Sequence, residues 1–247
     1  MDKIIKEIEK ELRKNIDPEY KESVKRFFKK EDIEKAKEEG YSKSYGVRTP
    51  MFRKISVKYF KAIRDCSKIE IFDLCRELLE SGYGEERGIA FDWAYRLKEY
   101  YEPSDFGIFK SWLEKYVHSW GSCDSLCTGA FGEFIFQFPE FITEVKKWTK
   151  SKNRWFRRAS AVIMIYSIRR KRKLKTILQI ADKLLLDEDD LVQKGYGWML
   201  KEASNNYPEE VFNYVMKNKK EMPRTALRYA IEKLSPELRS EAMKKDL

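Results

Sequence analysis

RWFRRASAVIMIYSIR, residues 154–169, is the stretch that decides the fold, because it reads as an apolar helix with small residues directly after Arg158. The same pattern recurs along the chain. A polar residue opens a comparable helix at Arg87, Asp124, Arg158, Lys194 and Arg228, at successive spacings of 37, 34, 36 and 34 residues. A more amphipathic helix precedes each following position. A two-helix unit of this length predicts an α-solenoid of HEAT-like repeats.

The rest of the chain also has helical periodicity, and no segment alternates polar and apolar residues as a strand does. Ile4, Ile8 and Leu12 share one face of a first helix. Thr49-Pro50 predicts the N-cap and first position of another helix. Four prolines stand where helices are expected to begin, namely Pro103, Pro139, Pro208 and Pro223. Further helices are expected over 69–82, 85–99, 104–117, 120–137, 139–149, 154–169, 171–186, 188–204, 208–217 and 223–234.

These repeats predict an all-α fold, a single curved domain over residues 1–247 whose inner helices line a concave basic face. The residues that open the inner helices would bring four cations and one carboxylate to that face or its rim, which suits a phosphodiester backbone. The segment 29–48 interrupts the helices, since it is charged and holds two glycines. We expect a mobile surface loop there, which either orders over a ligand or stays solvated.

The charge of the chain favours a polyanionic partner. Its 247 residues include 51 Lys and Arg against 41 Asp and Glu, a net charge of +10. Nucleic acid is the first partner that such an excess indicates and an anionic membrane the second, although a generically basic protein has the same charge. No apolar run is long enough to span a bilayer and no signal-peptide pattern is present. We expect a cytoplasmic, nucleoid-associated protein without membrane contact.

The sequence offers little for a metal or a cofactor. Cys66, Cys75, Cys123 and Cys127 include no CxxC pair, so a disulfide framework is not expected. His118 is the one histidine of the sequence, and with Cys123 and Cys127 it would leave zinc short of a fourth ligand. The sequence also has neither a GxGxxG nor a Walker A loop. We therefore expect no metal site and no cofactor.

Aromatic and charged residues pair at helical spacing on two of the inner helices. Trp120 stands four residues before Asp124, and Lys194 four residues before Trp198. Repeats stacked in register would make Asp124, Arg158 and Lys194 neighbours. Indole faces can grip a sugar or base, a guanidinium can hold a phosphate, and a carboxylate can stabilise an oxocarbenium ion. Together these groups describe cleavage of an N-glycosidic bond in DNA.

Structural roles account for the same residues in another way. A tryptophan at helical spacing is more often part of a core than of a ligand site. Asp124 can also serve as a helix cap or as the ion-pair partner of Arg158. These alternatives stay open at the level of residue spacing.

The motifs in their order resemble the AlkD family of DNA alkylation-repair glycosylases, which are HEAT-like helical solenoids. The similarity extends over essentially the whole chain. Its marks are GVRTP at 46–50, W-x3-D at 120–124 followed by Gly132, NRWFRRA at 153–159, QKGYGW at 193–198 and MPRTALRYAIEKL at 222–234.

The resemblance implies excision of N3- and N7-alkylated purines, such as 3-methyladenine and 7-methylguanine, from double-stranded DNA in base excision repair. It assigns the catalytic carboxylate to Asp124, places Trp120 and Trp198 beside the sugar and backbone of the lesion, and gives Arg158 a phosphate contact. Phe27 stands where some family members have a tyrosine near the lesion.

Lys194 and Arg228 complete the expected DNA-binding set, since they open inner helices as Arg158 does. No lysine is singled out as a nucleophile, so a monofunctional glycosylase is favoured over a lyase. The chain is expected to act as a monomer without an obligate protein partner. Two other functions remain: a non-catalytic HEAT-like module that binds nucleic acid by shape and charge, and a protein-interaction scaffold.

Overall fold

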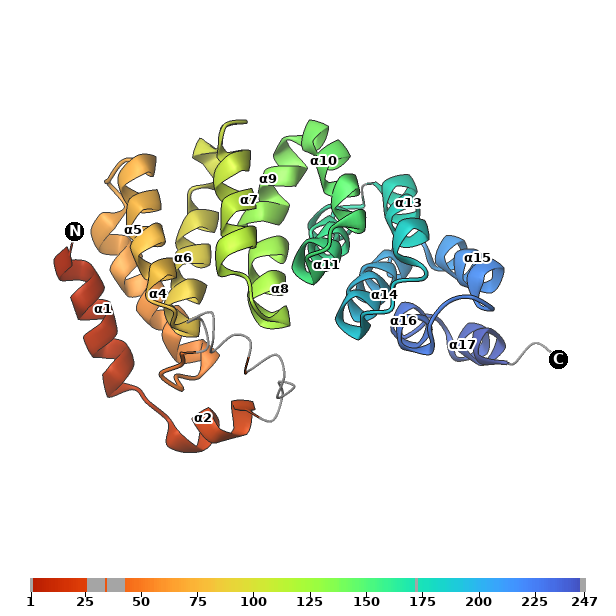
Figure 1. Ribbon diagram of the computed structural model, residues 1–247, viewed down its shortest axis with the longest axis horizontal. Helices are drawn as coiled ribbons and strands as arrows, with labels where there is room; N and C mark the ends of the chain where they lie inside the picture. The colour runs from red at the N-terminus through yellow and green to blue at the C-terminus, as the bar shows by residue number, and fades with distance from the viewer. Residues whose placement is uncertain (1, 26–33, 35–42, 172, 245–247) are drawn as a thin grey trace. The chain divides into compact units, whose positions relative to one another are not determined.

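The computed structural model describes residues 2–25, 34, 43–171 and 173–244 (Figure 1). Across these residues all regular structure is helical, apart from one isolated β-bridge between Lys43 and Tyr83. The predicted all-α class is confirmed. The chain divides into two compact units, Met1–Ser125 and Leu126–Leu247, and the division falls inside helix α8, Trp120–Thr128. The single domain, the solenoid and the basic face stay predictions.

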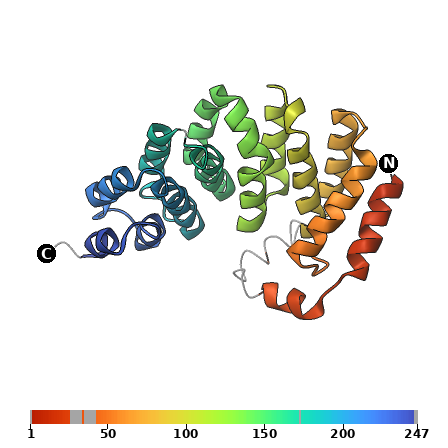
Figure 2. The ribbon, with the colours of Figure 1, turned by 180° about the vertical axis from the view of Figure 1, so that it is seen from behind.

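Unit 1 is built from helices that pack side by side around an aliphatic and aromatic core. Figures 1 and 2 show α4, α5 and α6 as neighbours, and α1 packs against α4. Ile71, Leu78, Trp93 and Phe109 are among the fully buried side chains. The helices before α8 are α1 Asp2–Lys14, α2 Pro18–Lys25, α4 Thr49–Ile63, α5 Lys68–Glu80, α6 Gly84–Arg96 and α7 Asp105–Tyr116, with a 3-10 turn at Lys98–Tyr100.

Unit 2 follows the same principle, with α14 packed between α11 and α16. Its helices after α8 are α9 Ala130–Gln137, α10 Ile142–Lys147, α11 Arg154–Val162, α12 Met164–Ile168, α13 Leu174–Leu184, α14 Asp190–Ser204, α15 Pro208–Asn218, α16 Arg224–Ala230 and α17 Pro236–Met243. Two 3-10 turns, Pro139–Phe141 and Trp148–Lys150, flank α10. No helix in the described part of the chain is long and apolar enough to cross a membrane.

Small residues at the aligned positions let neighbouring helices approach closely. A Cβ on Gly88 of α6 would come within 3.0 Å of the Phe52 ring on α4. A Cβ on Gly197 of α14 would lie 2.7 Å from Cβ of Tyr229 on α16. Both distances are shorter than an ordinary Cβ contact, so a larger residue would push the helices apart. The small residues of the repeat are therefore a packing requirement within each unit.

Most predicted helices are present, with boundaries moved by a few residues. Two predicted helices are each broken in two: 120–137 at Gly129, whose ψ of −116° is not helical, and 154–169 at Ile163. α4 begins one residue earlier than predicted, with Arg48 as N-cap and Thr49 as its first residue. The C-terminal helix α17 was not predicted, although Ser235 caps it and Pro236 opens it.

The predicted loop 29–48 lies mostly outside the described residues, but its last part is packed. Tyr45 and Val47 are buried. The Glu85 carboxylate at the start of α6 accepts hydrogen bonds from the backbone N–H of Tyr45 at 3.2 Å, Gly46 at 2.8 Å and Val47 at 3.0 Å. Because one carboxylate satisfies three amides, residues 45–47 are packed against the start of α6, and the predicted mobility of the rest of the segment stays a prediction.

A second carboxyl group, on the buried Glu86, binds the side chain of Tyr45 in the same segment. The Tyr45 hydroxyl donates to Glu86 Oε1 at 2.5 Å, and both residues are buried. The Tyr45 ring stacks on Tyr83 with centroids 4.0 Å apart, and the Arg13 guanidinium of α1 lies 5.3 Å from the centre of the Tyr45 ring. Burial raises the pKa of the Glu86 carboxyl above its ordinary value.

This raised pKa predicts a pH-dependent difference in stability between wild type and Glu86→Gln. The unfolded chain ionises Glu86 at its ordinary pKa, about 4.3, while the folded protein keeps the proton to higher pH. Between these two pKa values, wild-type stability therefore falls as pH rises, by up to about 1.4 kcal/mol for each pH unit. Glutamine does not titrate, so the unfolding free energy of the variant rises relative to that of wild type between about pH 4 and pH 7. Urea unfolding at both pH values measures this, and parallel curves would contradict it.

Candidate functional site

The N-terminus of α8 is fixed by two serines that cap it reciprocally. The backbone N–H of Ser122 donates to Ser119 Oγ at 3.2 Å, and the backbone N–H of Ser119 donates to Ser122 Oγ at 3.2 Å. With Ser119 as the cap, α8 begins at Trp120. Trp120 and Asp124 are therefore four residues apart within one helix and share a face, as the sequence predicted.

Trp120 stands apart from the tryptophans of the core. Its side chain is 39% exposed, whereas Trp93, Trp112 and Trp148 are exposed by 5% or less. Asp124, one turn further along α8, is partly exposed. The core interpretation of Trp120 is therefore wrong. A partly exposed indole one turn from a carboxylate can stack on a sugar while the carboxylate meets positive charge.

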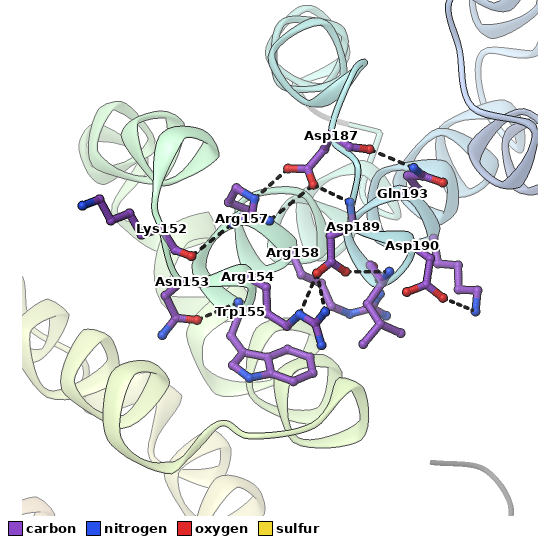
Figure 3. Close-up of polar contacts among 12 residues, drawn as sticks. Lys152, Asn153, Arg154, Trp155, Arg157, Arg158, Asp187, Asp189, Asp190 and Gln193 are labelled. Atoms are coloured by element: carbon purple, nitrogen blue, oxygen red, sulfur yellow. Dashed lines mark hydrogen bonds and ion pairs between the residues drawn. The ribbon is translucent and has the colours of Figure 1, made fainter. Parts of the chain in front are cut away.

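Arg158 on α11 is buried, with only 5% of its surface exposed. Its Nη1 donates to the backbone carbonyl of Leu191 in α14 (Figure 3). Gly195 makes room for it, since a Cβ there would lie 3.1 Å from Arg158 Cγ. Arg158 thus joins two neighbouring helices of unit 2. This structural role comes in addition to the predicted phosphate contact, which stays a prediction.

Two more arginines of α11 reach the loop before α14. Arg154 meets Asp189 at 2.6 Å, and Arg157 meets Asp187 at 2.7 Å (Figure 3). Asp189 is also the N-cap of α14 and accepts from the backbone N–H of Leu191 at 2.9 Å. Sequence analysis missed both carboxylates. The signal was the acidic run at 187–190, at the start of the helix predicted over 188–204.

Arg87 repeats the arrangement of Arg158 in unit 1. It is 7% exposed, and its Nη1 donates to the carbonyl of Tyr116 at 2.7 Å. The expectation that every cation of the repeat lies on an exposed rim or face is therefore wrong for Arg87 and Arg158. A buried guanidinium needs acceptors, and here backbone carbonyls supply them.

Lys194 and Arg228 hold the same place in their helices and remain accessible. Each is the fifth residue of its helix, α14 or α16, as Arg158 is of α11 and Asp124 of α8. Lys194 Nζ lies 3.3 Å from Asp190 Oδ2, a partly exposed pair, and Arg228 is exposed. A surface pair of this kind is weak, so Lys194 can exchange Asp190 for a phosphate at little cost.

Trp198 is partly exposed and donates from Nε1 to Glu202 Oε1 at 2.9 Å. Sequence analysis did not single out Glu202, although it stands four residues after Trp198 and so shares its helix face.

The structure gathers the predicted site residues in two groups. α8 carries Trp120 and Asp124 in unit 1, and unit 2 brings together Arg158, Lys194 and the other residues of α11 and α14. The predicted neighbourhood of Asp124 with Arg158 and Lys194 stays a prediction. Phe27 lies outside the described residues.

Comparison with known proteins gives a family match over most of the chain. A family model described as "DNA alkylation repair enzyme" matches residues 8–234. The fold is similar to the predicted DNA alkylation repair enzyme from Enterococcus faecalis, with a TM-score of 0.74 and 16% identity over 90% of this chain and 98% of that one. It is also similar to smu.31 from Streptococcus mutans UA159, with a TM-score of 0.54 and 19% identity over 75% and 96%. No curated protein matches the chain.

The two buried arginines give a paired prediction on stability. Arg87→Met and Arg158→Met keep most of the side-chain volume but remove the buried hydrogen bond that each guanidinium donates to a backbone carbonyl. Each variant should lose about 1–3 kcal/mol of unfolding free energy, measured by urea denaturation. Arg53→Met, at an exposed position on α4, is the control and should stay within about 0.5 kcal/mol of wild type. Wild-type stability in Arg158→Met would leave phosphate binding as its remaining role.

Proposed function

Because this chain belongs to the DNA alkylation repair enzyme family, we propose that it is a monofunctional DNA glycosylase. Its substrates are purines alkylated at N3 or N7 in double-stranded DNA, and it hydrolyses the N-glycosidic bond that joins them to deoxyribose. The observation that carries this proposal is the exposed Trp120 one turn before the partly exposed Asp124 on a capped helix.

The chemistry asks little of the protein. Alkylation at N3 or N7 gives the purine a positive charge, so the base leaves without being protonated. When the bond from C1′ to nitrogen breaks, the electron pair neutralises the purine, and positive charge develops on the sugar. Asp124 stabilises this oxocarbenium-like sugar and orients a water molecule. The water adds to C1′ and gives up one proton, by way of the Asp124 carboxylate, to the solvent.

The other predicted residues divide the tasks of binding. Trp120 and Trp198 offer indole faces to the sugar and backbone beside the lesion. Lys194 and Arg228, which remain accessible, neutralise phosphates. Arg158 holds α14 by way of the Leu191 carbonyl and so places Lys194 and Trp198, which stand on the same helix. A phosphate contact of the Arg158 guanidinium is part of the same proposal.

Binding to undamaged duplex DNA should weaken steeply with salt, because each Lys or Arg that meets a phosphate releases a counterion. Lys194→Ala and Arg228→Ala should each lower the slope of log K against log salt by about one. Arg76→Ala is the control, since it removes an exposed cation from α5, a helix that carries none of the proposed binding residues. Fluorescence anisotropy from low to moderate salt gives the slopes. Salt-independent binding would favour a different partner, as a protein-interaction scaffold requires.

Asp124→Asn tests the catalytic assignment. Asparagine keeps the shape of the side chain but removes the charge that stabilises the sugar, so release of 7-methylguanine should fall about 100-fold or more. Affinity for DNA should stay the same or rise slightly, because a negative charge facing phosphates is gone. Single-turnover base release from an oligonucleotide with one 7-methylguanine measures the rate, with enzyme in excess.

Asp65→Asn is the matched control, since it makes the same chemical change on a side chain that is 91% exposed. It should release base at the wild-type rate. A folded Asp124→Asn protein that keeps full activity would overturn the role of Asp124. A lower melting temperature with unchanged excision would make it a structural residue. Wild type that binds duplex DNA but releases no base would favour the non-catalytic module.

A further inference from the structure

Trp198 is held at two points by residues from two helices of unit 2. Its indole N–H donates to Glu202 Oε1 at 2.9 Å, within α14. Arg169, directly after α12, donates from Nε to Glu202 Oε2 at 2.9 Å and from Nη2 to Oε1 at 3.0 Å. The same guanidinium lies 5.9 Å from the centre of the Trp198 ring. Glu202 is therefore hydrogen-bonded to the edge of the indole, and the Arg169 guanidinium lies over the face of the ring.

The charges of Arg169 and Glu202 strengthen the hydrogen bond to the Trp198 indole. The hydrogen bonds that Arg169 donates hold the pKa of the Glu202 carboxyl below its ordinary value, and Glu202 in turn raises the pKa of Arg169. Glu202 therefore stays ionised at neutral pH and accepts a charge-assisted hydrogen bond from the indole. Its side chain is 14% exposed, so water competes little for the carboxylate.

Packing alone does not require this arrangement. Trp93, a core tryptophan, is fully buried and needs only one backbone carbonyl, that of Ser56 at 3.1 Å, for its N–H. Trp198 is partly exposed, and the N–H of an exposed indole can be satisfied by water. Instead, a bidentate ion pair with Arg169, the residue directly after α12, fixes the carboxylate that holds this partly exposed ring. That is what a surface for stacking needs, because its use depends on the direction of the ring.

We propose that Glu202 and Arg169 are positioning residues that hold the Trp198 indole in the orientation in which it meets the deoxyribose and backbone of the lesion. This inference rests on the proposed glycosylase function. Both residues act through Trp198, and neither touches the reacting atoms. Losing them lets the indole rotate, and misplacement of a positioning group by about 1 Å can cost up to about 100-fold in rate.

The variants separate positioning from charge. Glu202→Leu removes both contacts of the carboxylate. Glu202→Gln keeps an acceptor for the indole but sets an amide against Arg169 Nε. Glu232→Leu is the matched control, because Glu232 also pairs with a residue of α14, Lys201 at 2.6 Å, and the substitution changes the charge by the same amount.

Single-turnover release of 7-methylguanine should be about tenfold slower in Glu202→Leu, intermediate in Glu202→Gln and unchanged in Glu232→Leu. The two leucine variants should have equal affinities for DNA. In a Trp198→Phe background, Glu202→Leu should cause no further loss, because the ring that it positions has lost its N–H. Acrylamide should quench the fluorescence of Glu202→Leu more than that of wild type, and this increase should vanish in the Trp198→Phe background.

The outcomes are distinct for the two proposals. If the wild type is active and Glu202→Leu equals Glu232→Leu in rate and in quenching, the positioning role is overturned and the glycosylase function stands. A loss of rate that persists in the Trp198→Phe background would make Glu202 a general structural residue. No base release from wild type would overturn the glycosylase itself. If Glu202→Leu does not fold, Arg169→Met replaces it, since that variant keeps the hydrogen bond from Trp198 to Glu202.

Discussion

A guanidinium taken out of water must find acceptors inside the protein, and both units meet this constraint in the same way. Arg87 and Arg158 stand early in their helices, are buried, and donate to a backbone carbonyl about one repeat further along the chain. The bond from Arg87 joins α6 to the end of α7, and the bond from Arg158 joins α11 to α14, which are not consecutive in sequence. Each bond ties its helix to a neighbouring helix through a buried hydrogen bond, whose loss destabilises that contact.

The same constraint explains which features of the fold the sequence could predict. Helical periodicity, prolines and the repeat spacing are local signals, and they located most helices to within a few residues. The break at Ile163 carried no such signal, because apolar residues continue through it, whereas Gly129 itself was the local sign of the other break. The packing of residues 45–47 depends on Glu85, some 40 residues away, which composition within the segment does not reveal.

The residues of the candidate site could likewise be predicted where they share a helix, and not where their partners come from another helix. Trp120 and Asp124 could be paired from sequence because four residues within one helix fix their common face. Trp198 and Glu202 have the same spacing, but Glu202 reads as an ordinary surface residue until Arg169 is seen to meet it from 33 residues earlier. Asp187 and Asp189 were hidden for the same reason, as their arginine partners come from the preceding inner helix, α11.

The net charge of +10 therefore indicates a kind of partner without locating its surface. Arg154, Arg157 and Arg169 are bound to carboxylates, and Arg87 and Arg158 to carbonyls, so these cations are already used to hold helices together. A phosphate that displaced them would have to offset the loss of packing contacts. Exposed cations such as Arg228, or weakly paired ones such as Lys194, carry no such cost. These five arginines thus serve the architecture of the described helices, and accessible cations such as Lys194 and Arg228 are left to meet a polyanion.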